Sequence, residues 1–117
     1  MKIYVTKNSE YPVTMIGELE AITAIEENKG KLYGILGFWD DKTKIGAHTF
    51  QGEVEFISGG GERINYDNLS KLLDNTPKRG KQIVARLLGE DKKFVRQGTP
   101  WDIMITSPIQ EIREYSK

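Results

Sequence analysis

Residues 32–39 read Leu-Tyr-Gly-Ile-Leu-Gly-Phe-Trp, an apolar stretch without a charged side chain. Successive side chains of a β-strand point to opposite faces. One face would carry Leu32, Gly34, Leu36 and Phe38, and the other Tyr33, Ile35, Gly37 and Trp39. Because both faces carry apolar groups, this stretch is predicted to be a central strand that is covered on both sides. The glycines in and beside it suit strong curvature or close backbone packing.

Further β-strands are predicted on either side of this stretch. Upstream of it we expect strands over residues 2–6, 11–16 and 18–26. The last of these ranges also fits a helix, but Asn28-Lys29-Gly30 makes a good three-residue hairpin loop and favours the strand. Downstream, a polar turn over 40–44 leads to one long strand over 45–58, in which apolar and polar side chains alternate. The first half of the chain therefore predicts an antiparallel meander.

A helical hairpin is predicted after the glycine run at residues 59–61. Leu69, Leu72 and Leu73 would form the apolar stripe of a first helix over about 66–75. Thr76-Pro77 resembles an N-cap followed by proline at the first helical position, so a second helix would run from there to Leu88. Short strands are expected afterwards, over residues 94–96, 101–106 and 109–115.

The fold class expected from these elements is α+β, in a single domain over 1–117. It combines an antiparallel β-meander or open barrel with an inserted helical hairpin at about 66–88 and C-terminal strands. A meander leaves edge strands that must be paired, covered or blunted. We therefore expect the chain to form a homo-oligomer.

Composition excludes several kinds of chemistry. The chain has no cysteine, so it has no disulfide, no thiolate nucleophile and no cysteine-based zinc site. His48 is the single histidine, which leaves no second imidazole for a metal site. The sequence predicts no metal and no cofactor, and it favours binding over catalysis. It contains no apolar run of membrane-spanning length, so a soluble cytoplasmic protein without a membrane partner is expected.

The positive charge is concentrated in one segment. Residues 76–98 hold seven of the seventeen Lys and Arg residues and two acids, a net charge of +5 in a chain whose total charge is zero. Lys78, Arg79 and Lys81 would lie at the start of the second predicted helix, where cations oppose the helix dipole unless an anion sits among them. The segment therefore predicts an anionic partner.

The candidate ligand-binding residues extend from this cluster. Arg86 lies on the same predicted helix, and Gly60 belongs to a glycine run that could form an anion-binding nest beside Arg63. Trp39 and Trp101 could stack on a purine or fill a subunit interface. The full set is Lys78, Arg79, Lys81, Arg86, Arg63, Gly60, Trp39 and Trp101.

Four functions are compatible with this sequence. The first is a small non-catalytic binding protein that sequesters or senses a phosphate-bearing ligand such as a nucleotide signal. Small soluble proteins without motifs are common among phage and mobile-element products. Only this class-level association suggests such an origin here. The second is a protein–protein inhibitor or adaptor that acts on a host defence enzyme. The third is a DNA-binding protein with a helix-turn-helix-like hairpin, and the fourth is a small hydrolase or transferase.

Overall fold

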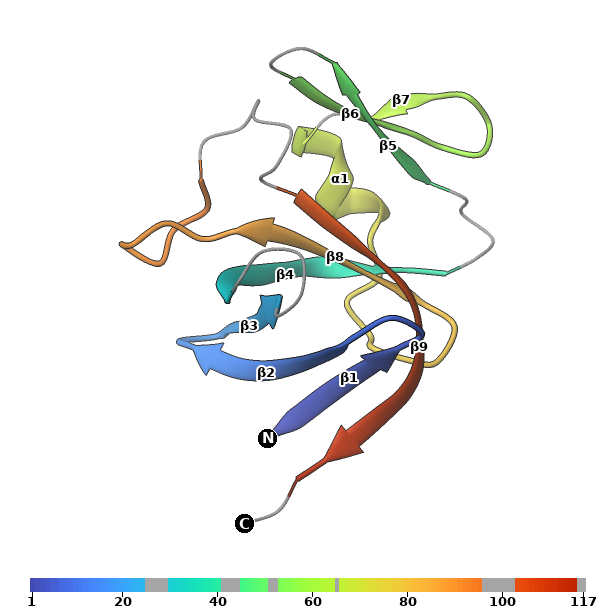
Figure 1. The fold of residues 1–117 in the computed structure, drawn as a ribbon. Helices are drawn as coiled ribbons and strands as arrows, with labels where there is room; N and C mark the ends of the chain where they lie inside the picture. The colour runs from blue at the N-terminus through green and yellow to red at the C-terminus, as the bar shows by residue number, and fades with distance from the viewer. Residues whose placement is uncertain (25–29, 41–44, 51–52, 65, 96–102, 116–117) are drawn as a thin grey trace.

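The computed structural model places most of the chain in a closed antiparallel barrel, with a smaller three-stranded sheet beside it (Figure 1). It describes residues 1–24, 30–40, 45–50, 53–64, 66–95 and 103–115. The side chains of residues 47–50, 53, 54, 66 and 67 also fall outside the description. Within the described part, no helix has the length and apolar character needed to span a bilayer.

Six strands form the barrel. In their order around it they are β1 (Lys2–Thr6), β2 (Glu10–Ile16), β3 (Leu19–Ala24), β4 (Lys31–Trp39), β8 (Gln82–Leu87) and β9 (Ile103–Glu114). The barrel closes where β9 pairs with β1, with Tyr4 opposite Ile112. The predicted strands over 2–6, 11–16 and 32–39 correspond to β1, β2 and β4 and are confirmed. The strand predicted over 18–26 is confirmed as β3 over Leu19–Ala24, and residues 25 and 26 lie outside the described residues.

The chain between β4 and β8 lies outside the barrel. It contains the small sheet of β5 (Gly46–Phe50), β6 (Glu53–Ile57) and β7 (Arg63–Ile64), followed by the helix α1 (Tyr66–Leu72). Figure 1 shows α1 between the small sheet and the barrel. The insertion therefore covers one outer side of the barrel.

Strand β4 contributes to two hydrophobic cores. Inside the barrel, Tyr33 and Phe38 pack with Tyr4, and the rings of Tyr4 and Phe38 meet edge to face at 5.6 Å. Outside the barrel, Trp39 packs in a second core with Phe56, ring to ring at 5.7 Å. The prediction that β4 is covered on both sides is confirmed.

The predicted division of β4 into two faces fails halfway along the strand. The pairing with β8 shifts register between Ile35 and Gly37. Such a shift inserts one extra residue and reverses the alternation of side chains beyond it. As a result Phe38 joins Tyr33 in the barrel core, whereas Leu36 and Trp39 belong to the outer core.

The outer core joins the insertion to the barrel. Its buried members come from β4, the start of β5, β6, β7, the α1 region and β8: Trp39, Ile45, Phe56, Ile64, Leu69, Leu73 and Val84. Burying apolar surface at about 25 cal/mol per Å² makes such a cluster a major contribution to stability. The small sheet and α1 are therefore packed against the barrel through a shared hydrophobic core.

The predicted helical hairpin is wrong, and with it the α+β fold class. α1 corresponds to the first predicted helix, but the second is strand β8, in which Ile83 and Ala85 face the barrel core and Val84 the outer core. The apolar positions 83, 84, 87 and 88 fit a helical stripe as well as a strand that is buried on both faces. Thr76-Pro77 is not a helix cap but part of an extended connection. The fold is therefore almost entirely β.

Two predicted strand boundaries are also corrected. The single strand expected over 45–58 is the hairpin of β5 and β6, in which Gly46 pairs with Ile57. The strands expected over 101–106 and 109–115 are one strand, β9, with Pro108 inside it. Pro108 lies opposite Gln82, beside a register shift where the N–H of Ile83 donates to the Thr106 side-chain oxygen. Proline has no backbone N–H. It is tolerated at a bulge of this kind because the strand pairing needs no N–H donor at that position.

The expectation of self-association rested on open sheet edges. Pairing of β9 with β1 closes the barrel, so the sheet edges in the described part of the chain belong to β5 and β7. Self-association stays a prediction.

Two glycines let other parts of the structure approach β4 closely. A Cβ added to Gly37 would lie 2.5 Å from the Cβ of Leu73, and one added to Gly34 would lie 2.9 Å from Leu19. Contacts below 3.0 Å require something to move, and the Leu73 Cβ is fixed to its backbone. The predicted close backbone packing is thus confirmed at Gly34 and Gly37, whereas Gly46 has open space.

Replacement of Gly37 by alanine tests this contact. We expect Gly37→Ala to lower the free energy of unfolding by ~1–3 kcal/mol, because the methyl group forces Leu73 away from β4. Gly46→Ala is the matched control and should change stability little, since nothing lies within 4 Å of its added Cβ. Urea denaturation of both variants measures the difference, and equal stabilities would contradict the close packing.

The leucines of α1 provide a second test. Leu69 is 1% exposed in the outer core, whereas Leu72 is 47% exposed. Leu69→Ala should therefore cost ~2–4 kcal/mol of unfolding free energy, and Leu72→Ala should stay within about 0.5 kcal/mol of the parent. Thermal or urea denaturation measures both values. A large loss at Leu72 would show that α1 presents a different face to the barrel.

Candidate functional site

The segment from Asp74 to Lys81, here the 74–81 loop, connects the α1 region to β8. Its first residue is fixed to β4, because the N–H of Phe38 donates to the Asp74 carbonyl at 2.8 Å. The Asp74 carboxylate accepts a second bond, from the Thr76 N–H at 2.8 Å, and a third from the Lys81 ammonium at 2.5 Å. Asp74 therefore holds both ends of the loop together.

The ammonium group of Lys81 is already paired within the loop. Its side chain is 6% exposed, and its ammonium forms the ion pair with Asp74, whose side chain is 59% exposed. A buried ammonium without a partner would destabilise the fold by several kcal/mol. The hydrogen bond from Lys81, and then those from Thr76, lower the pKa of Asp74 to about 2. Lys81 is thus a structural residue of the loop.

The far end of the loop is pinned to β9. The Gly80 N–H donates to the Ile109 carbonyl, and the Ile109 N–H donates to the Lys81 carbonyl, both at 2.8 Å. At this end of the loop, residues 78–81 form a turn that is closed by a hydrogen bond of 3.2 Å from the Lys81 N–H to the Lys78 carbonyl. Gly80 has a φ of +89°, which glycine adopts without strain. The turn leaves Lys78 and Arg79 exposed at its tip.

A hollow of about 530 Å³ lies beside the tip of the loop, lined by Arg79 and by Gln110, Glu111 and Ile112 of β9. The Glu111 carboxylate is 3.3 Å from the guanidinium of Arg113, which also pairs with Glu10 at 2.8 Å. Arg113 is thus shared between two carboxylates and offsets the negative charge of Glu111 in part. Neither Lys78 nor Arg79 forms an ion pair with another described residue.

The structure distributes the other predicted site residues over distant places. Arg86 donates to the Val95 carbonyl, and its guanidinium lies 5.5 Å from the centre of the Phe94 ring. Arg63 pairs with Glu55 at 3.7 Å in the small sheet, where Gly60 lies in the exposed turn before β7. These three residues are not brought together with Lys78 and Arg79.

Trp39 does not line the hollow. Trp39 is 1% exposed in the outer core, where its ring is covered by Phe56 and cannot stack on a ligand. Trp101 lies outside the described residues, as does the side chain of His48. The site predicted from the sequence is therefore reduced to Lys78 and Arg79, with Gln110 as a neighbour that sequence reasoning missed.

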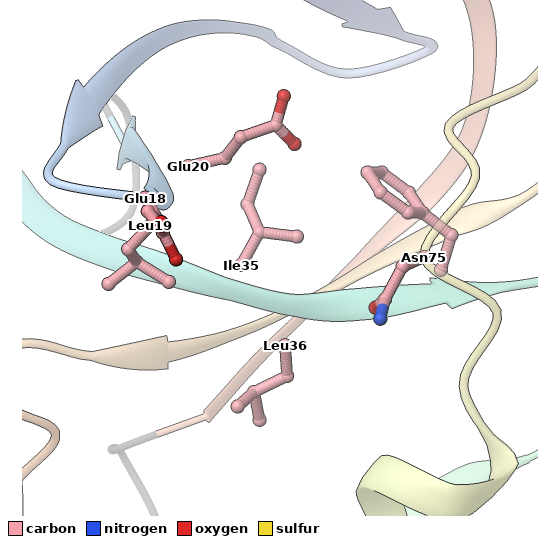
Figure 2. A pocket seen from close by; sticks show the side chains of 7 residues that line it. Glu18, Leu19, Glu20, Ile35, Leu36 and Asn75 are labelled. Carbon is pink, nitrogen blue, oxygen red and sulfur yellow. The ribbon is translucent and has the colours of Figure 1, made fainter.

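A second hollow, of about 380 Å³, opens between β3 and β4 (Figure 2). It is lined by Glu18, Leu19, Glu20, Ile35, Leu36, Phe38 and Asn75. No signal in the sequence pointed to it, because its walls come from three separate segments, one of which, at Asn75, is distant in sequence from β3 and β4. Asn75 belongs to the 74–81 loop, so the loop borders both hollows.

Comparison with protein-family models, curated proteins and solved structures gives no match for this chain. Among the described residues, no three His, Asp or Glu side chains come close enough to hold a metal ion. The chemistry of the candidate site therefore has to be inferred from its own geometry and charge.

The Asp74–Lys81 pair predicts a specific pH dependence. The pKa of Asp74 is lowered on folding, so its contribution to stability is present above the unfolded value of about 3.9 and is lost as the pH falls through the folded value. Asp74→Asn should reduce stability at neutral pH. Its difference from the parent should shrink as the pH falls from about 4 to about 2, the folded pKa.

Urea denaturation of both proteins over this pH range measures the difference. Glu62→Gln, a change at an exposed acid in the turn before β7, serves as the control. A difference between parent and Asp74→Asn that stays constant down to about pH 2 would show that the Asp74 carboxylate is not held by Lys81.

Proposed function

We propose that this protein is a non-catalytic binding protein for an anionic, phosphate-bearing ligand such as a nucleotide, which it sequesters or senses. The ligand would lie at the tip of the 74–81 loop, with its phosphate on Arg79 and Lys78. The observation that carries the proposal is the exposed pair of cations, without an ion pair to another described residue, beside a hollow of about 530 Å³.

The chemistry of the tip suits a phosphate group. A guanidinium presents a planar set of donors that can bind two phosphate oxygens at once, and an ammonium adds a compact charge. The amide of Gln110 is an uncharged donor in the same hollow. Glu111 would repel an anion, and Arg113 at 3.3 Å offsets its charge only in part, because Arg113 also pairs with Glu10.

The rigidity of the loop favours binding. Asp74 fixes its first residue to β4, and Ile109 fixes Gly80 and Lys81 to β9. A binding group that is already held in place loses less conformational entropy when the ligand arrives. The volume of the hollow also lies in the range of about 300–1,000 Å³ that is usual for small-molecule sites.

The structure bears differently on the three alternative functions. The helix-turn-helix hypothesis is withdrawn, because the helix that would enter a DNA groove is strand β8. The inhibitor or adaptor hypothesis and the hydrolase or transferase hypothesis remain alternatives, but no observation in the described residues favours either over ligand binding.

The proposal predicts a loss of affinity when both cations are neutralised. Lys78→Gln combined with Arg79→Gln should weaken binding of a nucleotide by about a hundredfold or more, because each charge-assisted phosphate contact is worth ~1.5–3 kcal/mol. Both side chains are exposed, so stability without ligand should stay within about 0.5 kcal/mol of the parent. Isothermal titration with mono-, di- and triphosphates of the common nucleosides measures the affinity.

The matched control removes the same charge elsewhere. Lys92 and Lys93 are exposed beyond the far end of β8, so Lys92→Gln with Lys93→Gln should leave the affinity unchanged. Equal losses in the two double variants would mean that only overall charge matters. If no nucleotide or inorganic phosphate binds the parent protein, the proposed function is wrong.

A further inference from the structure

The wall of the barrel is interrupted between β3 and β4. The ladder between them ends where Ala21 pairs with Gly34, although β4 continues to Trp39. The next backbone contact on that side is the one between Phe38 and Asp74. Over residues 35–37, β4 therefore has no ladder partner from β3. The hollow of about 380 Å³ lies at this interruption, and we call it the β3–β4 slot.

The slot combines apolar walls with negative charge. Leu19, Ile35, Leu36 and Phe38 supply the apolar surface, and Asn75 supplies an amide at one end (Figure 2). The two charged residues that line it, Glu18 and Glu20, are both acids. A ligand that fits this surface must therefore carry a positive group on an apolar body.

The two carboxylates differ in how far they are already neutralised. Glu20 accepts a hydrogen bond from the Tyr4 hydroxyl at 3.4 Å and lies 3.8 Å from the Lys2 ammonium. Burial, together with the charge of Glu20, raises the pKa of Tyr4, so the hydroxyl keeps its proton. Glu18 is exposed in the turn between β2 and β3 and has no ion pair with another described residue. Glu18 is thus the stronger attraction for a cation.

We propose that the β3–β4 slot binds a small organic amine. Its ammonium would pair with Glu18, assisted by Glu20, and its apolar body would lie across the open edge of β4, with Ile35 on the barrel side and Leu36 on the outer side. The site would be independent of the phosphate site proposed above, because its charge has the opposite sign and its own acids would repel a phosphate.

The dimensions favour a small molecule over a peptide strand. Ladder pairing at Gly34 closes one end of the slot, and the contact between Phe38 and Asp74 closes the other. Three residues of extended chain span about 10 Å, so a partner strand of ordinary length cannot lie along the open part of β4. A compact ligand can enter from the side.

Titration with phenethylamine tests the proposal, and 2-phenylethanol serves as its neutral counterpart of similar shape. In ¹H–¹⁵N spectra, phenethylamine should shift the amide signals of Glu18–Glu20 and of residues 35–37. The alcohol should bind about tenfold more weakly, because it lacks the charge-assisted contact. Glu18→Gln should weaken the amine by a similar factor and leave the alcohol unchanged.

Two control variants separate this site from other effects. Glu62→Gln removes an exposed acid near β7 and should not change the affinity for the amine. Lys78→Gln with Arg79→Gln should also leave it unchanged, so failure of the phosphate proposal would not imply failure of this one. The amide spectrum of Glu18→Gln without ligand shows whether the barrel is intact.

Four outcomes would overturn the proposal. The first is equal affinity for the amine and the alcohol, and the second is an equal loss in Glu18→Gln and Glu62→Gln. The third is tighter binding of a capped lysine peptide than of phenethylamine, which would indicate a protein partner in place of a small amine. The fourth is a set of amide shifts confined to residues outside the slot.

Discussion

β4 has to be buried on both faces, and the rest of the structure is arranged around this requirement. Tyr33 and Phe38 need the closed barrel, whereas Trp39 needs a cover outside it. The small sheet and α1 provide that cover. Because Leu73 packs directly on Gly37, the chain leaving α1 passes next to β4, and Asp74 arrives beside Phe38. The position of the 74–81 loop follows from how β4 is packed.

The sequence predicts those parts of the fold whose signal is local. β1 to β4 follow from short alternating or apolar runs, and the apolar character of both faces of 32–39 correctly indicates double coverage. Residues 82–87 could not be assigned in this way. A strand with Ile83 facing one core and Val84 the other has no polar face, so its pattern does not distinguish it from a helix. The choice depends on β4 and β9, which are distant in sequence.

The same ambiguity between helix and strand explains why the predicted site residues lie far apart in the structure. A helix advances about 1.5 Å per residue, and a strand about 3.3 Å. Cations that would share one short helix are therefore spread along the chain, with Lys78 and Arg79 before the start of β8 and Arg86 near its end. Lys81 had no feature in the sequence to show that it would be buried, because its partner Asp74 was assigned to the preceding helix. The β3–β4 slot has no sequence signal, since it exists only where two strands separate.

The pairing of β1 with β9 has a consequence for how the protein is made. Lys2 lies opposite Glu114, so β1 gains its second neighbour only after β9 has been synthesised. Until then β1 and β2 form part of an open sheet with an unprotected edge, and contacts between such distant residues form slowly. Nascent chains that stall before β9 would be targets for chaperones or for aggregation, even though the completed barrel has buried that edge.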